Sequence, residues 1–336
     1  MVCTSTEAYH HTACYREGNC QSYFHPKKRS IDVQTVQTND KEYSLSDAKV
    51  PKTLFMSSLL FTFVPNISNM LKFICLGSGS SGNCYCLFTE NDGLMIDAGI
   101  GIRLLKRSFK EYGLSLSQIH HILVTHDHAD HVKSVGAISL DYQLPVYATH
   151  LVHAGIERNY CVHKKVAPAY MEVIDKGQPF QLGDFTVTPF GVPHDSSDNV
   201  GYKIECGNIV FTLMTDIGHV TDEMKTVISE TNYLVIEANH DPKMLMYGPY
   251  PQHLKIRISG PNGHLANQDC AQALAENMTE RMRHVWLCHL SEENNRPDLA
   301  HETVAHILRT NGIQAGTDVL LDVLKRKSPS SLYNLE

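Results

Sequence analysis

Apolar runs from residue 70 onward predict a chain dense in strands and helices. Residues 70–76 form an apolar run that ends at a glycine and is typical of a strand. Asn91-Asp92-Gly93 separates two short apolar runs at 85–89 and 94–96, which indicates a hairpin. Residues 103–112 carry apolar positions at helical spacing and stop at Gly113.

The same reasoning extends to the C-terminal region. Further strands are predicted at 121–124, 146–148, 180–182, 185–190, 202–205, 209–212, 233–237 and 285–288. Further helices are predicted at 132–140, from a Thr221 cap to 229, from an Asn267 cap to 277, and at 297–309. Strands cluster, then alternate with helices, and the pattern recurs. This order favours two mixed sheets packed face to face with helices outside.

Residues 1–69 differ from the rest, because they are polar and irregular with no sustained period. We expect them to be a poorly ordered N-terminal extension or an upstream-start artefact, with Met70 as the natural start. The alternative is a genuine tail that binds a partner. The apolar stretch 54–64 is too short to span a bilayer, and it lies too far from the N-terminus for a signal peptide. We therefore expect one domain at 70–336 and no membrane association.

Charge and cysteine content bear on substrate attraction and cellular location, and they do not indicate the reaction. The formal charge of −7 gives no global attraction for nucleic acid or an anionic membrane, so a local site must hold any anionic substrate. The ten cysteines are scattered without C-x-x-C spacing. Free thiols of this kind favour a reducing, cytoplasmic location.

The segment 125–131, Thr-His-Asp-His-Ala-Asp-His, follows the strand predicted at 121–124. Its imidazoles His126, His128 and His131 and the carboxylate of Asp130 are ligands that zinc prefers, with manganese or iron as further options. The alternative is a polar loop in a histidine-rich chain, which we consider far less consistent with such dense spacing.

Three more candidate ligands each follow a predicted strand: His194, Asp216 and His289. Any one alone is typical of a polar residue at a strand end, but three after such a loop favour a two-metal site. The predicted site holds one ion by His126, His128 and His194 and the other by Asp130, His131 and His289, with Asp216 bridging both.

This order of residues resembles the metallo-β-lactamase-fold hydrolases, whose first motif matches Asp97, an aspartate that supports the metal loop. Further motifs of the chain are Gly77-Ser78-Gly79-Ser80-Ser81-Gly82-Asn83-Cys84, Glu237-Ala238-Asn239-His240-Asp241, Met244-Leu245, Tyr250-Pro251, Leu254-Lys255, Arg257-Ile258, Gly263-His264-Leu265-Ala266-Asn267 and His289-Leu290-Ser291-Glu292-Glu293-Asn294-Asn295. These motifs resemble those of the narrower YycJ/WalJ-type branch, with Ala266 as one departure from its usual serine.

The resemblance covers residue 70 to the C-terminal region, and implies a four-layer αββα sandwich with two divalent ions, zinc or manganese, at one edge. It also implies a phosphodiesterase, described for the branch as a 5′→3′ DNA exonuclease, with DNA as substrate. Composition and spacing by themselves predict only a two-metal hydrolytic site, in which a metal-bridging hydroxide is the nucleophile. Protein partners are not predicted.

Asp130, Asp216 and His264 are the predicted catalytic residues. Asp216 holds both ions, and Asp130 accepts a hydrogen bond from the hydroxide. His264 contacts the scissile phosphate or protonates the leaving oxygen. The alternative for His264 is a capping residue before the helix predicted at Asn267.

Further residues are candidates for substrate binding or for orienting ligands. The glycine loop with Ser80 and Asn83 offers backbone N–H groups to a phosphate, or is a tight turn that lets strands approach. Lys255 and Arg257, with Tyr247 and Tyr250 nearby, follow a nucleic-acid strand or form a solvated face. The polar segment Asn239, His240 and Asp241 lines the cleft or orients ligands.

Two other functions use the same residues. One is hydrolysis of a small ester, thioester or lactone on the same fold, because one fold and one ligand set serve many reactions. The other is a non-catalytic regulator that binds metals for structure, which the open coordination positions disfavour.

Overall fold

Two seven-stranded sheets form the centre of the computed structural model, which describes residues 70–336. The predicted extension at 1–69 lies outside these residues. The first sheet has the order β14 (Tyr333–Leu335), β1 (Leu71–Gly77), β2 (Cys84–Phe88), β3 (Gly93–Ile96), β4 (His121–Leu123), β5 (Val146–Ala148), β6 (Met171–Val173). The second has the order β13 (Leu320–Val323), β12 (His284–Cys288), β11 (Tyr233–Glu237), β10 (Ile209–Met214), β9 (Val200–Cys206), β8 (Phe185–Gly191), β7 (Phe180–Leu182).

Each sheet is half antiparallel and half parallel. Strands β14 to β3 pair antiparallel, and β3 to β6 pair parallel. In the second sheet β7 to β10 pair antiparallel, and β10 to β13 pair parallel. In the parallel half of a sheet all carboxyl ends lie at one edge, so residues that follow these strands are brought together.

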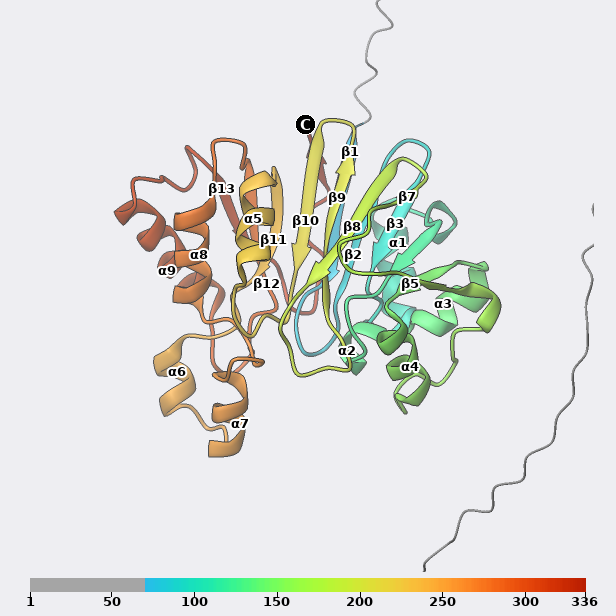
Figure 1. The fold of residues 1–336 in the computed structure, drawn as a ribbon, viewed down its shortest axis with the longest axis horizontal. Helices are drawn as coiled ribbons and strands as arrows, with labels where there is room; N and C mark the ends of the chain where they lie inside the picture. The colour runs from blue at the N-terminus through green and yellow to red at the C-terminus, as the bar shows by residue number, and fades with distance from the viewer. Residues whose placement is uncertain (1–69) are drawn as a thin grey trace, which may run out of the picture. The chain divides into compact units, whose positions relative to one another are not determined.

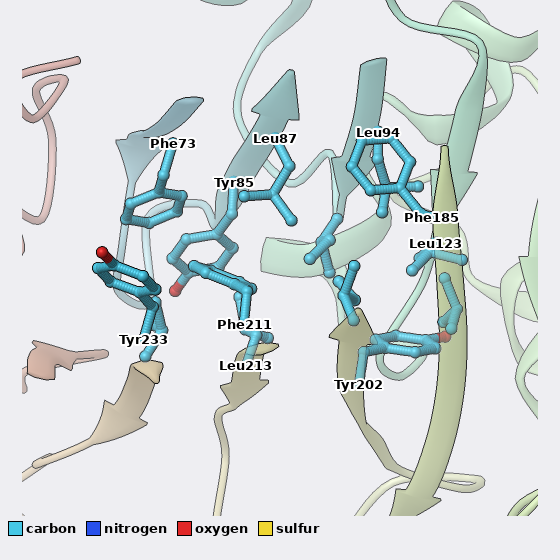
Figure 2. Close-up of a cluster of buried hydrophobic side chains, with 14 of the residues drawn as sticks. Phe73, Tyr85, Leu87, Leu94, Leu123, Phe185, Tyr202, Phe211, Leu213 and Tyr233 are labelled. Atoms are coloured by element: carbon cyan, nitrogen blue, oxygen red, sulfur yellow. The ribbon is translucent and has the colours of Figure 1, made fainter. Parts of the chain in front are cut away.

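The facing sides of the two sheets enclose one apolar core (Figure 2). Phe73 of β1 is fully buried, and its ring centroid lies 5.0 Å from that of Phe211 in β10 and 4.8 Å from that of Trp286 in β12. Tyr85 of β2 and Tyr202 of β9 are also fully buried in this core. Apolar residues from both inner faces therefore hold the sheets together.

Helices cover the outer face of each sheet. Helices α1 (Ile102–Glu111), α3 (Val135–Tyr142) and α4 (His150–Arg158) pack on the first sheet. Helices α5 (Asp222–Glu230), α8 (Asn267–Asn277) and α9 (Pro297–Thr310) pack on the second. Figure 1 shows α3 and α4 on one side of the strands and α8 and α9 on the other. The predicted αββα sandwich is confirmed.

Two element predictions differ from the structure. The helix predicted at 132–140 is two helices, α2 (Ala129–Val132) and α3, because the backbone N–H of Ser134 donates to Ala98 and not to its own helix. Asn267 is the first residue of α8 and not its cap. Its side chain bonds with that of Asn295 instead.

Other elements had no clear sequence signal and were not predicted: α4, β6, β13, β14, α6 (Pro242–Tyr247), α7 (Gln252–Ile258) and the 3₁₀ turns Leu116–Gln118 and Pro168–Tyr170. The strands among them are three or four residues long, so they carry few alternating positions. Among residues 70–336 no helix is long and apolar enough to cross a membrane.

Candidate metal centre

Sharp turns after the strands aim the candidate ligands at one edge of the sandwich. Asp97 follows β3, Asp216 follows β10 and His289 follows β12, and their φ angles are 58°, 56° and 52°. Left-handed backbone is costly for residues with a side chain and is found mainly at functional sites. Within residues 70–336 only one other non-glycine residue, Gln143, has a positive φ.

Three imidazoles form the first donor group. Ring centroids of His126, His128 and His194 lie 4.7 to 5.2 Å apart, and their donor atoms lie within 4.8 Å of one another. Nδ1 of His194 donates to the carbonyl of Gly263 at 2.9 Å, and Nδ1 of His126 lies 3.1 Å from the Thr125 hydroxyl. These bonds leave both Nε2 atoms free to bind a cation.

The second donor group combines Asp130, His131 and His289, whose donor atoms also lie within 4.8 Å of one another. The carboxylate of Asp216 lies between the two groups, with its oxygens 3.3 Å from Nε2 of His131 and 3.7 Å from Nε2 of His194. The structure therefore brings all seven residues of the predicted ligand set close together. Donor atoms also lie within 4.8 Å of one another in two overlapping groups, His126–His131–Asp216 and Asp216–Glu237–His264–His289.

Buried polar residues hold the second group from behind. Asp97 is fully buried, and accepts hydrogen bonds from His131 Nδ1 at 2.7 Å and from the N–H and hydroxyl of Thr125 at 2.8 Å each. Asn83 Nδ2 lies 3.3 Å from Asp130 Oδ2 and 2.9 Å from His131 Nε2. These hydrogen bonds fix the orientation of the His131 ring.

Close backbone contacts fix the segment 125–131 against its neighbours. A Cβ at Gly99 would lie 1.6 Å from the carbonyl oxygen of Asp130, so a side chain cannot fit there. Gly82 has φ 149°, and a Cβ there would lie 2.9 Å from the Gly99 backbone. The glycine loop is therefore a tight turn that permits close packing, one of the two readings considered for it.

Charges around the centre shift the pKa values in opposite directions. Burial lowers the pKa of His126 well below its usual value, and burial also lowers the pKa of His194. Burial opposes charge on His131, but Asp216, Asp97 and Asp130 outweigh it and raise its pKa to about 10. Burial disfavours the carboxylate of Asp216, yet His289 and His131 hold its pKa well below the usual range. Burial therefore favours the neutral forms of His126 and His194, whereas the surrounding carboxylates favour the charged form of His131.

Glu237 is the site residue for which the sequence analysis proposed no role. It ends β11 and is fully buried. Its Oε1 accepts from His264 Nδ1 at 2.8 Å and lies 3.0 Å from His289 Nδ1. Its Oε2 accepts from the backbone N–H groups of Ile217 and Leu265. A carboxylate that closes a wholly apolar strand was the signal available in the sequence.

His264 lies beside this centre and does not cap a helix. Its Nδ1 is 3.8 Å from the Asp216 carboxylate, and its side chain is 15% exposed. Burial opposes charge on this ring, but Glu237 outweighs it and raises the pKa of His264. The N-cap position of α8 is Ala266, which makes no side-chain cap. The ring is therefore available to donate a proton.

The residues present fit divalent metal ions. Within residues 70–336, Nε2 of His126 and Nε2 of His194 are buried and have no hydrogen-bond partner. A buried polar atom without a partner is costly, and a cation between these imidazoles would satisfy both atoms. Neutral imidazoles with carboxylates are the donors that zinc and manganese accept.

Comparison with known proteins agrees with this geometry. The family model described as Beta-lactamase superfamily domain matches residues 93–289, more than half of the chain. The chain belongs to the metallo-β-lactamase superfamily. It is 35% identical to "Exodeoxyribonuclease YycJ" of Bacillus anthracis, over 78% of this chain and 98% of that protein. It is 33% identical to "Exodeoxyribonuclease WalJ" of Streptococcus pneumoniae, over 74% of this chain and 91% of that protein.

Solved structures share the fold at low sequence identity. Zn(2+)-bound PqqB from Methylobacterium extorquens has a TM-score of 0.58 and 16% identity, covering 77% of this chain and 99% of that one.

The family model and the two sequence relatives confirm membership in the YycJ/WalJ-type branch of the metallo-β-lactamase superfamily, and they confirm the prediction of a metal-dependent hydrolase.

The residues predicted to bind substrate or orient ligands in this metallo-β-lactamase superfamily member lie in different surroundings. Asn239 Nδ2 donates to the His289 carbonyl at 2.8 Å, whereas Asp241 caps α6 by accepting from Met244 N–H. Arg257 pairs with Asp195, next to His194, and Lys255 Nζ donates to the Met246 carbonyl. Ser80 is exposed on the glycine loop, and His240 is buried beside α6. These positions leave their roles in substrate binding as predictions.

Proposed function

We propose that the chain is a phosphodiesterase that degrades DNA from the 5′ end and uses two divalent metal ions. The observation that carries this proposal is the pair of donor groups that share Asp216, in a chain 33–35% identical to proteins named exodeoxyribonuclease. We further propose that residues 70–336 form the single catalytic domain. The free described cysteines support a cytoplasmic location, which stays a prediction.

His126, His128 and His194 would hold one ion, Asp130, His131 and His289 the other, and Asp216 both. Two such ions supply Lewis acidity, which activates water and neutralises charge on a phosphoryl group. The imidazole and carboxylate donors of both groups suit zinc and manganese.

The protein's own groups then have defined tasks. His264 holds a proton on a ring that Glu237 orients and keeps basic, so it can protonate the leaving oxygen of the phosphodiester. Asp130 faces His131 and His289 and can accept a hydrogen bond from the attacking water. Asp97 keeps His131 in a fixed orientation through its Nδ1.

Substrate comparison tests this function. The full chain, loaded with manganese or with zinc, is incubated separately with 5′-end-labelled DNA, 3′-end-labelled DNA, bis(p-nitrophenyl) phosphate and a thioester. We expect early release of labelled mononucleotide from the 5′-labelled strand and stepwise shortening of the 3′-labelled strand. Turnover of the thioester without cleavage of DNA would instead support the small-molecule alternative.

A further inference from the structure

A pocket of about 240 Å³ lies between the short helices α6 and α7. Leu245, Met246 and Ile256 form its apolar walls, with His240 and Lys255 also lining it. This volume is below the roughly 300–1,000 Å³ of pockets that take drug-sized ligands, so it suits a single flat ring system.

The pocket lies close to the candidate metal centre. His240 directly follows Asn239, whose side chain donates to the His289 carbonyl. The His240 carbonyl accepts from Asn267 N–H, and His240 pairs with Ala266, two residues after His264. Figure 1 shows α6 and α7 at the same end of the sheets as α2, which carries Asp130 and His131. The pocket and the candidate metal centre therefore lie at the same end of the sandwich.

The segment that carries α6 and α7 is positively charged and can attract a polyanion. Residues 242–258 contain Lys243, Lys255 and Arg257 and no carboxylate, a formal charge of +3 in a chain whose total is −7. Arg257 is paired with Asp195, whereas the Lys255 ammonium contacts only the backbone carbonyl of Met246 among the described hydrogen bonds and ion pairs. The segment thus provides local attraction that the whole chain lacks.

Two of the apolar side chains that line the pocket are largely exposed. Met246 is 64% exposed and Ile256 is 63% exposed, on the two helices that flank the pocket. His240, in contrast, is 97% buried, and its Nδ1 has no hydrogen-bond partner among residues 70–336. The apolar walls match the π-faces of a heteroaromatic base, and the polar side chains of His240 and Lys255 line the same pocket.

We propose that this pocket binds one unstacked nucleobase of the substrate strand, next to the scissile phosphate. This inference rests on the proposed nuclease function and names the form of the substrate. A base inside a duplex is stacked and paired, so it must leave the helix to enter the pocket. The base that occupies the pocket is therefore unpaired and unstacked when the strand is cleaved.

Binding without cleavage tests the pocket directly. The full chain is treated with chelator, and its affinity for a short 3′-fluorescein-labelled single strand is measured by fluorescence anisotropy. The strand is compared with versions that carry one abasic residue at the first or at the second nucleotide. We expect one of the two abasic strands to bind roughly 5- to 150-fold more weakly, the range expected for loss of a stacked base.

The double variant Met246→Ala, Ile256→Ala removes the exposed walls and should bind intact and abasic strands equally. Leu151→Ala is the matched control, because Leu151 is also an exposed helical residue (53%) but lies on α4, outside the pocket. The control should discriminate as the wild type does. Equal binding of intact and abasic strands by the wild type would overturn the inference, as would discrimination retained in the double variant.

A cleavage arm separates this inference from the proposed function. With metals restored, the wild type should cleave one abasic strand more slowly than the intact strand. If the wild type binds and cleaves intact and abasic strands equally, the pocket does not bind a nucleobase, and the proposed nuclease function is unaffected. Discrimination in binding without cleavage of any DNA would refute the nuclease and retain the pocket as a nucleobase site.

Discussion

Replacing Glu237 by Gln removes the charge that links His264 and His289. Oε2 must remain an acceptor, because it receives the N–H groups of Ile217 and Leu265 at 2.6 Å and 3.1 Å. The new amide NH₂ then faces the Nδ1 atoms of both histidines, at the position where Oε1 lies 2.8 Å and 3.0 Å away. The substitution therefore keeps the size of the side chain and reverses its hydrogen bonding at one atom.

The expected loss follows from the bond between Glu237 and His264. A hydrogen bond to a charged group contributes about 1.5–3 kcal/mol, equivalent to roughly 10- to 150-fold in rate if it is lost in the transition state. Full removal of a general acid costs roughly 100- to 10,000-fold, so a smaller loss is expected while His264 remains. We predict a fall in kcat of roughly 10- to 150-fold with KM little changed.

The pH–rate profile provides the second readout. Glu237 raises the pKa of His264, and the protonated ring is the active form. Without the carboxylate the pKa of His264 falls. The alkaline limb of the pH–rate profile, where activity is lost as His264 loses its proton, should therefore shift to lower pH. Initial rates on labelled single-stranded DNA across pH, with metal content measured on each sample, give both quantities.

Glu230→Gln is the matched control, because it makes the same change in a partly exposed Glu–Lys pair on α5, away from the metal centre. It should leave kcat and the pH profile as in the wild type. An unchanged alkaline limb in Glu237→Gln, with metal content retained, would refute the role assigned to Glu237 and His264. Loss of bound metal alone would point to His289 as the affected partner.

Three further outcomes are expected. Asp97→Asn should weaken metal retention by roughly 10- to 100-fold in a chelator titration, because both carboxylate oxygens of Asp97 accept hydrogen bonds and an amide keeps only one accepting oxygen. Unchanged retention would contradict this. Phe211→Ala should lower the free energy of unfolding by about 3–5 kcal/mol, measured by urea denaturation, because Phe211 is fully buried between the sheets. A loss below about 1 kcal/mol would contradict this packing. Metal affinity should rise with pH toward about 10, because His131 has a raised pKa and must lose its proton to bind; an affinity independent of pH would contradict this.

Much of the fold could be predicted because periodicity reports burial. The strands 146–148 and 233–237 appear in the structure with the predicted bounds, and Thr221 caps α5 as predicted. The seven candidate ligands could be found for a related reason, since each is a polar residue directly after an apolar strand or within one dense histidine loop. Strand ends at one sheet edge then bring them together.

Other features depend on contacts between distant segments, which a local pattern does not contain. The break between α2 and α3 arises from the bond of Ser134 to Ala98, and Asn267 pairs with Asn295 and not with its own helix. Glu237 resembles any charged residue at a strand end until two histidines are found beside it. The pocket at α6 and α7 likewise appears only once these helices are packed together.

The most direct measurement is cleavage of end-labelled DNA by the metal-loaded full chain beside Asp216→Asn. Asn tolerates the left-handed backbone of this position, so the fold should be retained while the shared carboxylate is lost. Asp222→Asn is the control, on the exposed first turn of α5. We predict stepwise shortening from the 5′ end by the wild type and Asp222→Asn alone. Absence of cleavage by a wild type that holds two ions per chain, or cleavage unchanged in Asp216→Asn, would contradict the account.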